Sequence, residues 1–237
     1  ELSIADEADL ELVAEERRLS TSTLTRWGLV QSAIDREWIL PAYGMKEEVN
    51  NIYRWGFVKD KRRLMSTATL SQCLFGLNLW ESEKPEAIIC EGPWDAMRLE
   101  EELRKYRLDG SRLVRTSDVS RSLAANINVV AVPGCEVFRE EWLTLFKDKR
   151  VTLLYDNDHP RTNRKTGKEI IPPALSGMTK AARLLRSVTS TLLAVRWGEA
   201  WYDSDLADGY DTRDYLNDGN SVVSLLQKFE AVPEDWV

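Results

Sequence analysis

Cysteine and histidine are scarce in this chain of 237 residues, which contains three cysteines and one histidine. The cysteines Cys73, Cys90 and Cys135 are widely separated and form no C-x-x-C pair. Because structural zinc sites need four Cys or His ligands at short spacings, the sequence argues against such a site within it. The spacing also lacks the pattern of a disulfide scaffold, so we expect all three cysteines to be reduced and in or near the core.

Long hydrophobic runs are missing as well. No apolar stretch approaches the roughly 20 residues of a membrane-spanning helix. Residues 1–16 are acidic and lack the apolar segment of a signal peptide. The composition, 43% hydrophobic and 30% charged, is ordinary for a soluble protein. These features predict a cytoplasmic protein, and the initial Glu1 in place of Met suggests a trimmed chain or a fragment of a longer one.

An excess of positive charge is also absent, since 32 Lys and Arg face 39 Asp and Glu for a formal net charge of −7. That total argues against a nucleic-acid partner, but the distribution of charge is more informative. Residues 54–63 hold five basic side chains against one acid: Arg54, Lys59, Lys61, Arg62 and Arg63. A second basic stretch covers residues 161–168. Such runs are usually solvated faces, and the alternative is contact with phosphates.

Two short acidic motifs follow apolar runs. The sequence E-G-P-W-D at 91–95 comes directly after residues 87–90, and D-N-D at 156–158 comes directly after residues 151–155. Short apolar runs of this kind predict buried parallel strands, and open α/β sheets carry their sites at the carboxyl edge of such strands. Carboxylates crowded there repel one another unless cations neutralise them. Hard oxygen ligands suit Mg²⁺ or Mn²⁺, so the sequence predicts a divalent-metal site that acts on phosphates.

The order of these motifs resembles the TOPRIM domain, shared by DnaG-type primases, topoisomerases, OLD-type nucleases and recombination mediators. Its pattern is a strand ending in E-G-x-x-D and a later strand ending in D-x-D, which match residues 91–95 and 156–158. Residues 128–132 are similar to the strand between the two motifs. Residues 209–216 are similar to the acidic segment that closes the primase version. Neither motif is specific alone, but the ordered set is hard to obtain by chance.

The segment before the first motif narrows the resemblance to primases. Residues 24–29 are similar to the helix and glycine that open the RNA-polymerase domain of primases. Residues 38–44 and 49–55 predict a strand and its hairpin partner, and L-F-G-L at 74–77 leads towards the first motif. This arrangement is similar to the primase half of phage and mitochondrial helicase–primase chains. The resemblance covers roughly residues 24–220.

The implied fold class is α/β. A TOPRIM domain with a mostly parallel central sheet flanked by helices would occupy residues 85–220, preceded by a smaller mixed α+β subdomain at residues 23–84. An N-terminal helix or extension would take residues 1–22, and a C-terminal helix or tail residues 221–237. For residues 109–126 we expect an irregular connection without regular secondary structure. Residues 159–173 form a polar, basic excursion that the family pattern lacks, and we interpret it as a tolerated insertion, with a lid over nucleotide or template as the alternative.

The resemblance implies roles for individual acids. Glu91 would be a catalytic general base or metal-proximal acid that activates the 3′-hydroxyl of the growing chain, and Glu91, Asp156 and Asp158 would lie at a two-ion Mg²⁺ or Mn²⁺ site. An acid of the closing segment, Asp211 or Asp214, would complete the metal cluster. Arg213 stands where bacterial primases often have a second acid, which leaves open which of the two reaches the metal.

Other interpretations remain open for several of these residues. Asp95 would face the same crevice as Glu91 and take part in catalysis, or would simply complement the helix dipole as a first-turn acid. A D-x-D motif also occurs in haloacid-dehalogenase-type phosphatases, but there it lies near the chain start. Asp156 and Asp158 are expected to point to one side, with Asn157 directed away. In the resembled family a basic ridge binds template and nucleotide phosphates, and the basic residues at 54–63 match its location approximately.

The function that the resemblance implies is that of a DNA primase catalytic core, a DNA-dependent RNA polymerase in a bacterial or phage-infected cell. Its partners would be a single-stranded DNA template and ribonucleoside triphosphates. A replicative helicase and a separate zinc-ribbon module are further possible partners, and no membrane is expected. Two alternatives are a TOPRIM nuclease that uses the same acids to activate water, and a non-catalytic TOPRIM module that binds DNA or loads other proteins onto it.

Overall fold

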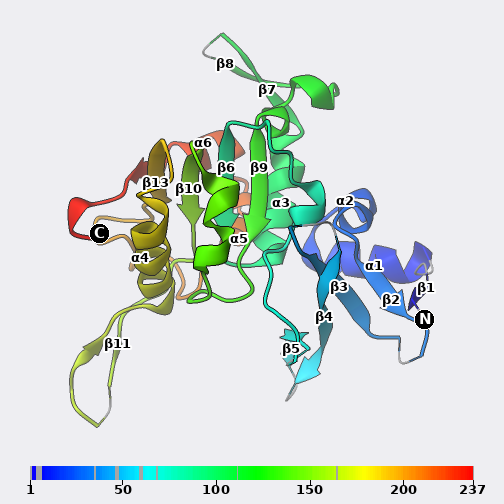
Figure 1. The fold of residues 1–237 in the computed structure, drawn as a ribbon, viewed down its shortest axis with the longest axis horizontal. Coiled ribbons are helices and arrows are strands. Elements are labelled where there is room, and N and C mark those ends of the chain that lie inside the picture. Colours follow the sequence, from blue (N-terminus) through cyan, green and yellow to red (C-terminus); the bar gives the residue numbers. More distant parts are fainter. Residues whose placement is uncertain are drawn as a thin grey trace. The chain divides into compact units, whose positions relative to one another are not determined.

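The computed structural model describes residues 2–3, 7–34, 36–45, 48–58, 61–67, 69–110, 112–163 and 165–236 (Figure 1). The chain divides into two compact units, residues 1–80 and 81–237. The division into four parts that the sequence suggests stays a prediction. Among the described residues, no helix has both the length and the apolar character needed to cross a membrane.

The first unit is a five-stranded antiparallel sheet with two helices. Its strands follow the chain order β1 (Leu2–Ser3), β2 (Val30–Ser32), β3 (Trp38–Tyr43), β4 (Val49–Val58) and β5 (Lys61–Ser66). The helices are α1 (Glu7–Arg17) and α2 (Thr21–Arg26). The hairpin predicted from residues 38–44 and 49–55 is confirmed as β3 and β4. A mixed α+β subdomain at this end of the chain was therefore predictable from its alternating strands.

The ends of α2 show how local sequence defines the start of this unit. Ser20 Oγ accepts a hydrogen bond from the Thr23 backbone N–H at 3.2 Å and caps the helix. Trp27 is the C-cap of the helix, and Gly28 has a φ of +83°, a left-handed conformation that glycine adopts without strain. Trp27 is 1% exposed. This is the helix followed by glycine that the sequence indicated.

The second unit contains a five-stranded sheet in the order β14-β13-β10-β6-β9. Four strands are parallel: β6 (Glu86–Cys90), β9 (Ile127–Ala131), β10 (Arg150–Leu154) and β13 (Thr191–Val195). The short strand β14 (Phe229–Ala231) pairs antiparallel with β13. The predicted fold class, α/β with a mostly parallel sheet, is confirmed. Residues 127–131 lie between the motif strands in sequence, but β9 is an edge strand of the sheet.

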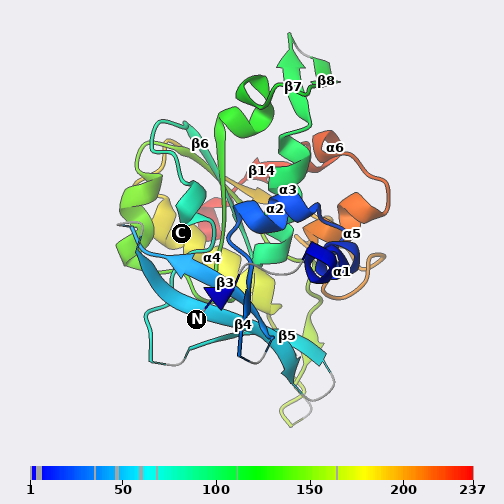
Figure 2. The same cartoon turned by 90° about the vertical axis from the view of Figure 1, so that its right-hand side faces the viewer.

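Helices cover both faces of this sheet. Figure 1 shows α4 (Pro173–Leu185) and the 3₁₀ segment at Glu140–Phe146 in front of the sheet, with α5 (Thr212–Asn217) behind it. Figure 2 shows α3 (Pro93–Leu103), α5 and α6 (Val222–Leu226) grouped together on one side. Both α3 and α4 begin with proline, which suits a first helical turn because the backbone N–H that proline lacks would have no intrahelical partner there.

Two excursions from this unit are hairpins and not irregular chain. The first follows α3 and pairs β7 (Tyr106–Asp109) with β8 (Arg112–Arg115), and the second pairs β11 (Arg161–Thr162) with β12 (Glu169–Ile170). The prediction of an irregular stretch from residue 109 was wrong for its first part, where β8 lies. Gly110 and Gly167, with φ of +61° and +67°, allow the chain to turn in the two hairpins.

Close packing of α4 against the segment after β9 generates a stability prediction. A Cβ atom added at Gly177 would lie 2.0 Å from the Cys135 carbonyl oxygen, which is backbone and has little freedom to move. We expect Gly177→Ala to lower the free energy of unfolding by about 1–3 kcal/mol, the usual cost of overpacking. Urea unfolding followed by circular dichroism measures this change.

The matched control is Gly134→Ala, because a Cβ atom there meets only Val137 at 3.5 Å, an ordinary contact. If both variants kept the stability of the wild-type protein, α4 would not approach the Cys135 carbonyl as closely as the structure indicates.

Candidate active site

The two acidic motifs meet at one edge of the second unit's sheet. Strands β6 and β10 are direct parallel neighbours, with Cys90 opposite Leu154 at their carboxyl ends. Glu91 and Asp156 follow these ends, and the Asp156 backbone N–H donates to Glu91 Oε2 at 3.2 Å. The two strand ends are therefore side by side, as the sequence predicted.

Asp95 lies in the first turn of α3. It is 8% exposed, and its Oδ1 accepts a hydrogen bond from the Arg213 backbone N–H at 3.3 Å. Gly92 is the N-cap of this helix, and a Cβ atom there would lie 3.0 Å from Asp95 Oδ2. The glycine of the motif therefore leaves room for the Asp95 carboxylate at the site.

The start of α5 brings a fourth segment to the cluster. Asp211 is the N-cap, and its Oδ1 accepts from the Asp214 backbone N–H at 2.7 Å while Asp214 Oδ2 accepts from the Asp211 backbone N–H at 3.3 Å. The guanidinium of Arg213 donates to Asp211 Oδ2 at 2.9 Å. The carboxylates of Asp95 and Asp211 also interact electrostatically, since the negative charge of Asp211 contributes to the raised pKa of Asp95. Of the two predicted acids, Asp211 thus faces the cluster, and Asp214 completes the helix cap.

Asp158 contacts the start of α4, where its Oδ2 accepts a hydrogen bond from the Ala174 backbone N–H at 3.1 Å. The negative charge of Asp158 contributes to the raised pKa values of both Glu91 and Asp156. Asp158 therefore belongs to the same electrostatic cluster as the other acids. We define the carboxylate cluster as Glu91, Asp95, Asp156, Asp158 and Asp211.

Burial and mutual repulsion disfavour the charged form of most of these acids. The pKa of Glu91 rises from 4.5 to about 7, first because burial removes it from water and then because Asp158 and Asp211 are negative. Burial, together with neighbouring carboxylates, also holds the pKa values of Asp95 and Asp156 well above their usual range. Burial likewise raises the pKa of Asp211, although Arg213 opposes the shift. The cluster carries more negative charge than its protein surroundings neutralise.

The donor chemistry of the cluster fits a divalent metal. Carboxylate oxygens are the ligands that Mg²⁺ and Mn²⁺ prefer, and a cation would relieve the repulsion that raises the pKa values. Among the described residues, no three or more His, Cys, Asp or Glu side chains lie close enough together in this structure to coordinate one metal ion. The residues therefore fit a metal in donor type and charge.

Comparison with solved structures identifies the fold of this chain. No family model and no curated protein matches the chain. Among solved structures, the zinc-binding and RNA polymerase domains of the Aquifex aeolicus primase are 20% identical, with a TM-score of 0.53, and the match covers 97% of this chain and 51% of that one. This chain therefore spans about half the length of the Aquifex chain.

Two further primase structures have a similar fold. The RNA polymerase domain of the Mycobacterium tuberculosis primase DnaG is 14% identical, with a TM-score of 0.58 over 96% of this chain and 78% of that one. The primase fragment of the bacteriophage T7 primase-helicase protein is 15% identical, with a TM-score of 0.52, and the match covers 86% of this chain and 68% of that one. The chain has the fold of a primase catalytic core. In this primase fold, the carboxylate cluster occupies the carboxyl edge of the parallel sheet.

Asn157 is a residue of the primase fold whose importance the sequence did not reveal. It is 0% exposed. Its Oδ1 accepts from the Asp203 backbone N–H at 2.7 Å, and its Nδ2 donates to the carbonyl oxygens of Asp203 and Ala207 at 3.0 and 3.2 Å. Its backbone also pairs with Tyr210, the residue before Asp211. Through these bonds, Asn157 holds the loop that delivers Asp211 to the cluster.

The predicted phosphate-binding residues lie in the first unit of the primase fold. Arg54 is in β4, and its Nη1 forms an ion pair with Glu37 Oε2 at 3.1 Å. Lys61, Arg62 and Arg63 belong to β5, opposite Val58, Phe57 and Gly56 of β4. Lys59 lies outside the described residues. Their contact with phosphates stays a prediction.

The raised pKa of Glu91 predicts how stability varies with pH in the absence of divalent ions. An unfolded glutamate ionises near 4.5, whereas folded Glu91 ionises near 7. Between these values the folded state retains a proton that the unfolded state has lost, so this contribution to stability falls as pH rises. We expect wild-type protein to lose about 1–3 kcal/mol relative to Glu91→Gln across this window. Urea unfolding in EDTA at several pH values tests this.

Glu83→Gln, an exposed substitution ahead of β6, is the control and should track the wild-type curve. A difference between wild type and Glu91→Gln that does not change with pH would contradict the assigned cause.

The contacts of Asn157 predict a local effect on the loop. Asn157→Ala removes four side-chain hydrogen bonds in a buried position, one of them with His159 Nε2, so we expect a loss of about 2–4 kcal/mol in stability. We also expect faster amide hydrogen exchange at residues 203–211. The matched control is Asn128→Ala, because buried Asn128 similarly bonds the backbone N–H and carbonyl of Glu81, each at 2.9 Å. Equal exchange at 203–211 in both variants would refute the assignment.

Proposed function

We propose that this chain is the catalytic core of a DNA primase, a DNA-dependent RNA polymerase that makes short RNA primers on single-stranded DNA. The observation that carries the proposal is the carboxylate cluster at the joined carboxyl ends of β6 and β10, within a primase fold. The motif order supports a TOPRIM assignment for this unit. The first alternative is a nuclease, because the same acids would serve an attack by water.

The solved structures with this fold support a nucleic-acid substrate. One of them is a DnaG primase catalytic domain bound to single-stranded DNA, 15% identical with a TM-score of 0.54. Another comes from a primase-helicase protein. We propose a single-stranded DNA template and ribonucleoside triphosphates as substrates of this chain. A replicative helicase and a separate zinc-ribbon module are its proposed partners.

Glu91 is the proposed proton acceptor. A general base works best when its pKa lies near the working pH, and the pKa of Glu91 is about 7. It would take the proton from the 3′-hydroxyl that attacks the incoming nucleotide. The Asp156 N–H that bonds one Glu91 oxygen fixes the direction of the carboxylate. Asp95, which is buried with a raised pKa, would donate a hydrogen bond to Asp211 and orient it.

Asp156, Asp158 and Asp211, next to Glu91, are the residues that would hold Mg²⁺ or Mn²⁺, and we propose two ions. When bound, such ions stabilise the charge on the attacking and leaving oxygens of a phosphoryl transfer. Asp214 is the weaker candidate ligand, because Asp211 and not Asp214 contributes to the raised pKa values of Glu91, Asp95 and Asp156. Arg213 supplies a fixed positive charge at Asp211. The basic residues Arg54, Lys59, Lys61, Arg62 and Arg63 are proposed to contact nucleic-acid phosphates in the first unit.

Neutralising one acid of the cluster tests the proposal. The Asp156→Asn variant keeps the shape of the side chain and removes its charge, so we expect primer synthesis to fall by at least about 100-fold while folding is retained. The assay supplies single-stranded DNA, labelled ribonucleotides and Mg²⁺ or Mn²⁺, and the products are separated by size. Asp109→Asn, on an exposed strand of the β7–β8 hairpin, is the control and should retain full synthesis.

The two other outcomes are informative. Shortened DNA without new RNA would assign the site to the nuclease alternative. Full synthesis by Asp156→Asn would exclude the carboxylate cluster as the catalytic site.

A further inference from the structure

A basic hairpin arises directly from the carboxylate cluster. We name residues 159–172 the edge hairpin; it contains β11 and β12 and connects Asp158 to the first residue of α4. Asp158 also accepts the hydrogen bond from the Ala174 N–H, so this cluster acid precedes the segment and bonds the first turn of the helix that follows it. Figure 1 shows the hairpin extending away from the sheet. Its root, in contrast, is part of the candidate active site.

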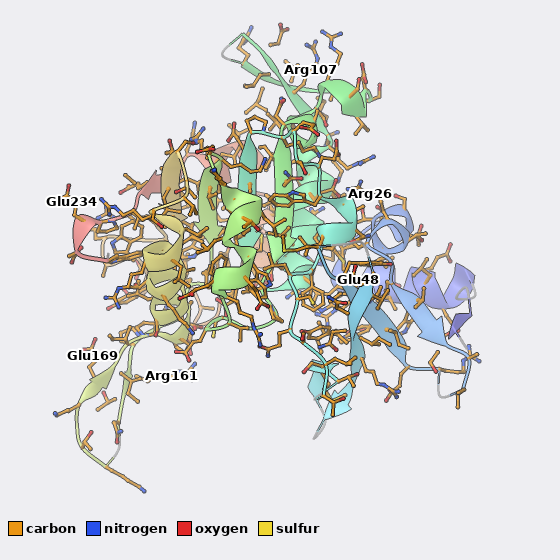
Figure 3. The ribbon with its side chains drawn as sticks, viewed as in Figure 1. Arg26, Glu48, Arg107, Arg161, Glu169 and Glu234 are labelled. Atoms are coloured by element: carbon orange, nitrogen blue, oxygen red, sulfur yellow. The ribbon has the colours of Figure 1, made fainter. Side chains whose placement is uncertain are left out.

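The root of the edge hairpin is anchored by charge. The His159 backbone N–H donates to Asp208 Oδ1 at 2.8 Å, and Arg161 Nη2 donates to Asp208 Oδ2 at 3.0 Å. Further out, Asn163 Oδ1 accepts from the N–H groups of Lys165 and Thr166 at 2.9 and 3.2 Å. Figure 3 labels Arg161 and Glu169, one on each strand of the hairpin. Both root and turn therefore have defined hydrogen bonds.

The surface of this hairpin combines positive charge with exposed aliphatic side chains. Residues 161–169 contain four basic residues and one acid, in a chain whose net charge is −7. Lys165 and Lys168 are exposed, and Ile170 and Ile171 are 47% and 64% exposed. Proteins that bind single strands pair cationic groups for the phosphates with apolar surface for the bases. An acidic cluster repels a phosphate chain, and positive charge beside it offsets that repulsion.

We propose that the edge hairpin is a nucleic-acid contact, which holds the sugar-phosphate backbone of a single strand beside the carboxylate cluster. This inference rests on the proposed function, because that function supplies a nucleic acid at this edge of the sheet. It replaces our interpretation of residues 159–173 as a tolerated insertion. An acidic protein segment is the competing occupant, and the experiment below separates the two.

The chain offers a matched control for charge. The β7–β8 hairpin, residues 106–115, also projects from this unit, and Figure 1 shows it at the opposite end of the sheet from the edge hairpin. Arg112 and Arg115 on it are exposed. Lys165→Ala/Lys168→Ala and Arg112→Ala/Arg115→Ala therefore remove the same number of positive charges from two hairpins of one protein. Only the first pair lies on the side of the carboxylate cluster.

The measurement is fluorescence anisotropy of a labelled oligodeoxythymidine with the whole chain, at several salt concentrations. We expect Lys165→Ala/Lys168→Ala to weaken binding about 5- to 20-fold and to lower the slope of log K against log salt by about 1.4, the value for two lost single-strand phosphate contacts. Arg112→Ala/Arg115→Ala should bind like wild type. Thermal unfolding of both variants checks that the fold is intact.

Three results overturn the proposal. Equal losses in the two variants would show that only overall charge matters, and no loss in either would leave an acidic protein as the remaining partner. A loss confined to Arg112→Ala/Arg115→Ala would place the nucleic acid on the other hairpin. Because binding is measured without synthesis, a wild-type protein that binds DNA but makes no primers would contradict the proposed function and leave this comparison valid.

Discussion

Parallel pairing of β6 with β10 is the constraint on which the candidate site depends. Strands joined directly in this way end at the same edge, so the residues that follow them meet although they are about 65 positions apart in sequence. An antiparallel pairing would send one motif to the opposite edge. Each of the other cluster acids then reaches the edge on a separate segment: Asp95 on α3, Asp158 at the root of the edge hairpin, and Asp211 at the start of α5.

The acids remain close together because the backbone holds them despite their repulsion. Backbone N–H groups bond Glu91, Asp95, Asp158 and Asp211, and they are donated by Asp156, by the first turn of α4 and by the first turn of α5. Such bonds to carboxylates are stronger than those between neutral groups. Arg213 is the basic side chain that contacts the cluster through an ion pair within the described chain. The site is thus a polar structure assembled at a cost in electrostatic energy, which is typical of functional sites.

Much of this arrangement was predictable from sequence because it depends on local rules. Apolar runs that end in acids predicted the parallel strands, and the motif at residues 24–29 predicted the end of α2 at a glycine. Three features were not predictable. The β7–β8 and β11–β12 hairpins were missed because their strands are short and lack alternating apolar and polar residues. The choice between Asp211 and Asp214 depends on a capping box that forms in three dimensions. The role of Asn157 depends on a loop about 46 to 53 positions away.

The final segment of the chain has a further consequence. Residues 221–237, which the sequence predicts to be a helix or tail, contain the helix α6 and also β14, which pairs with β13 as the last strand of the sheet. Open strand edges are templates for the pairing of other chains, and short strands with charged side chains discourage it. β14 has three residues, and Glu230 within it forms an ion pair with Arg196 at 2.8 Å. β14 therefore covers the edge of the apolar strand Thr191–Val195, and a protein that lacked β14 would expose that edge to pairing with other chains.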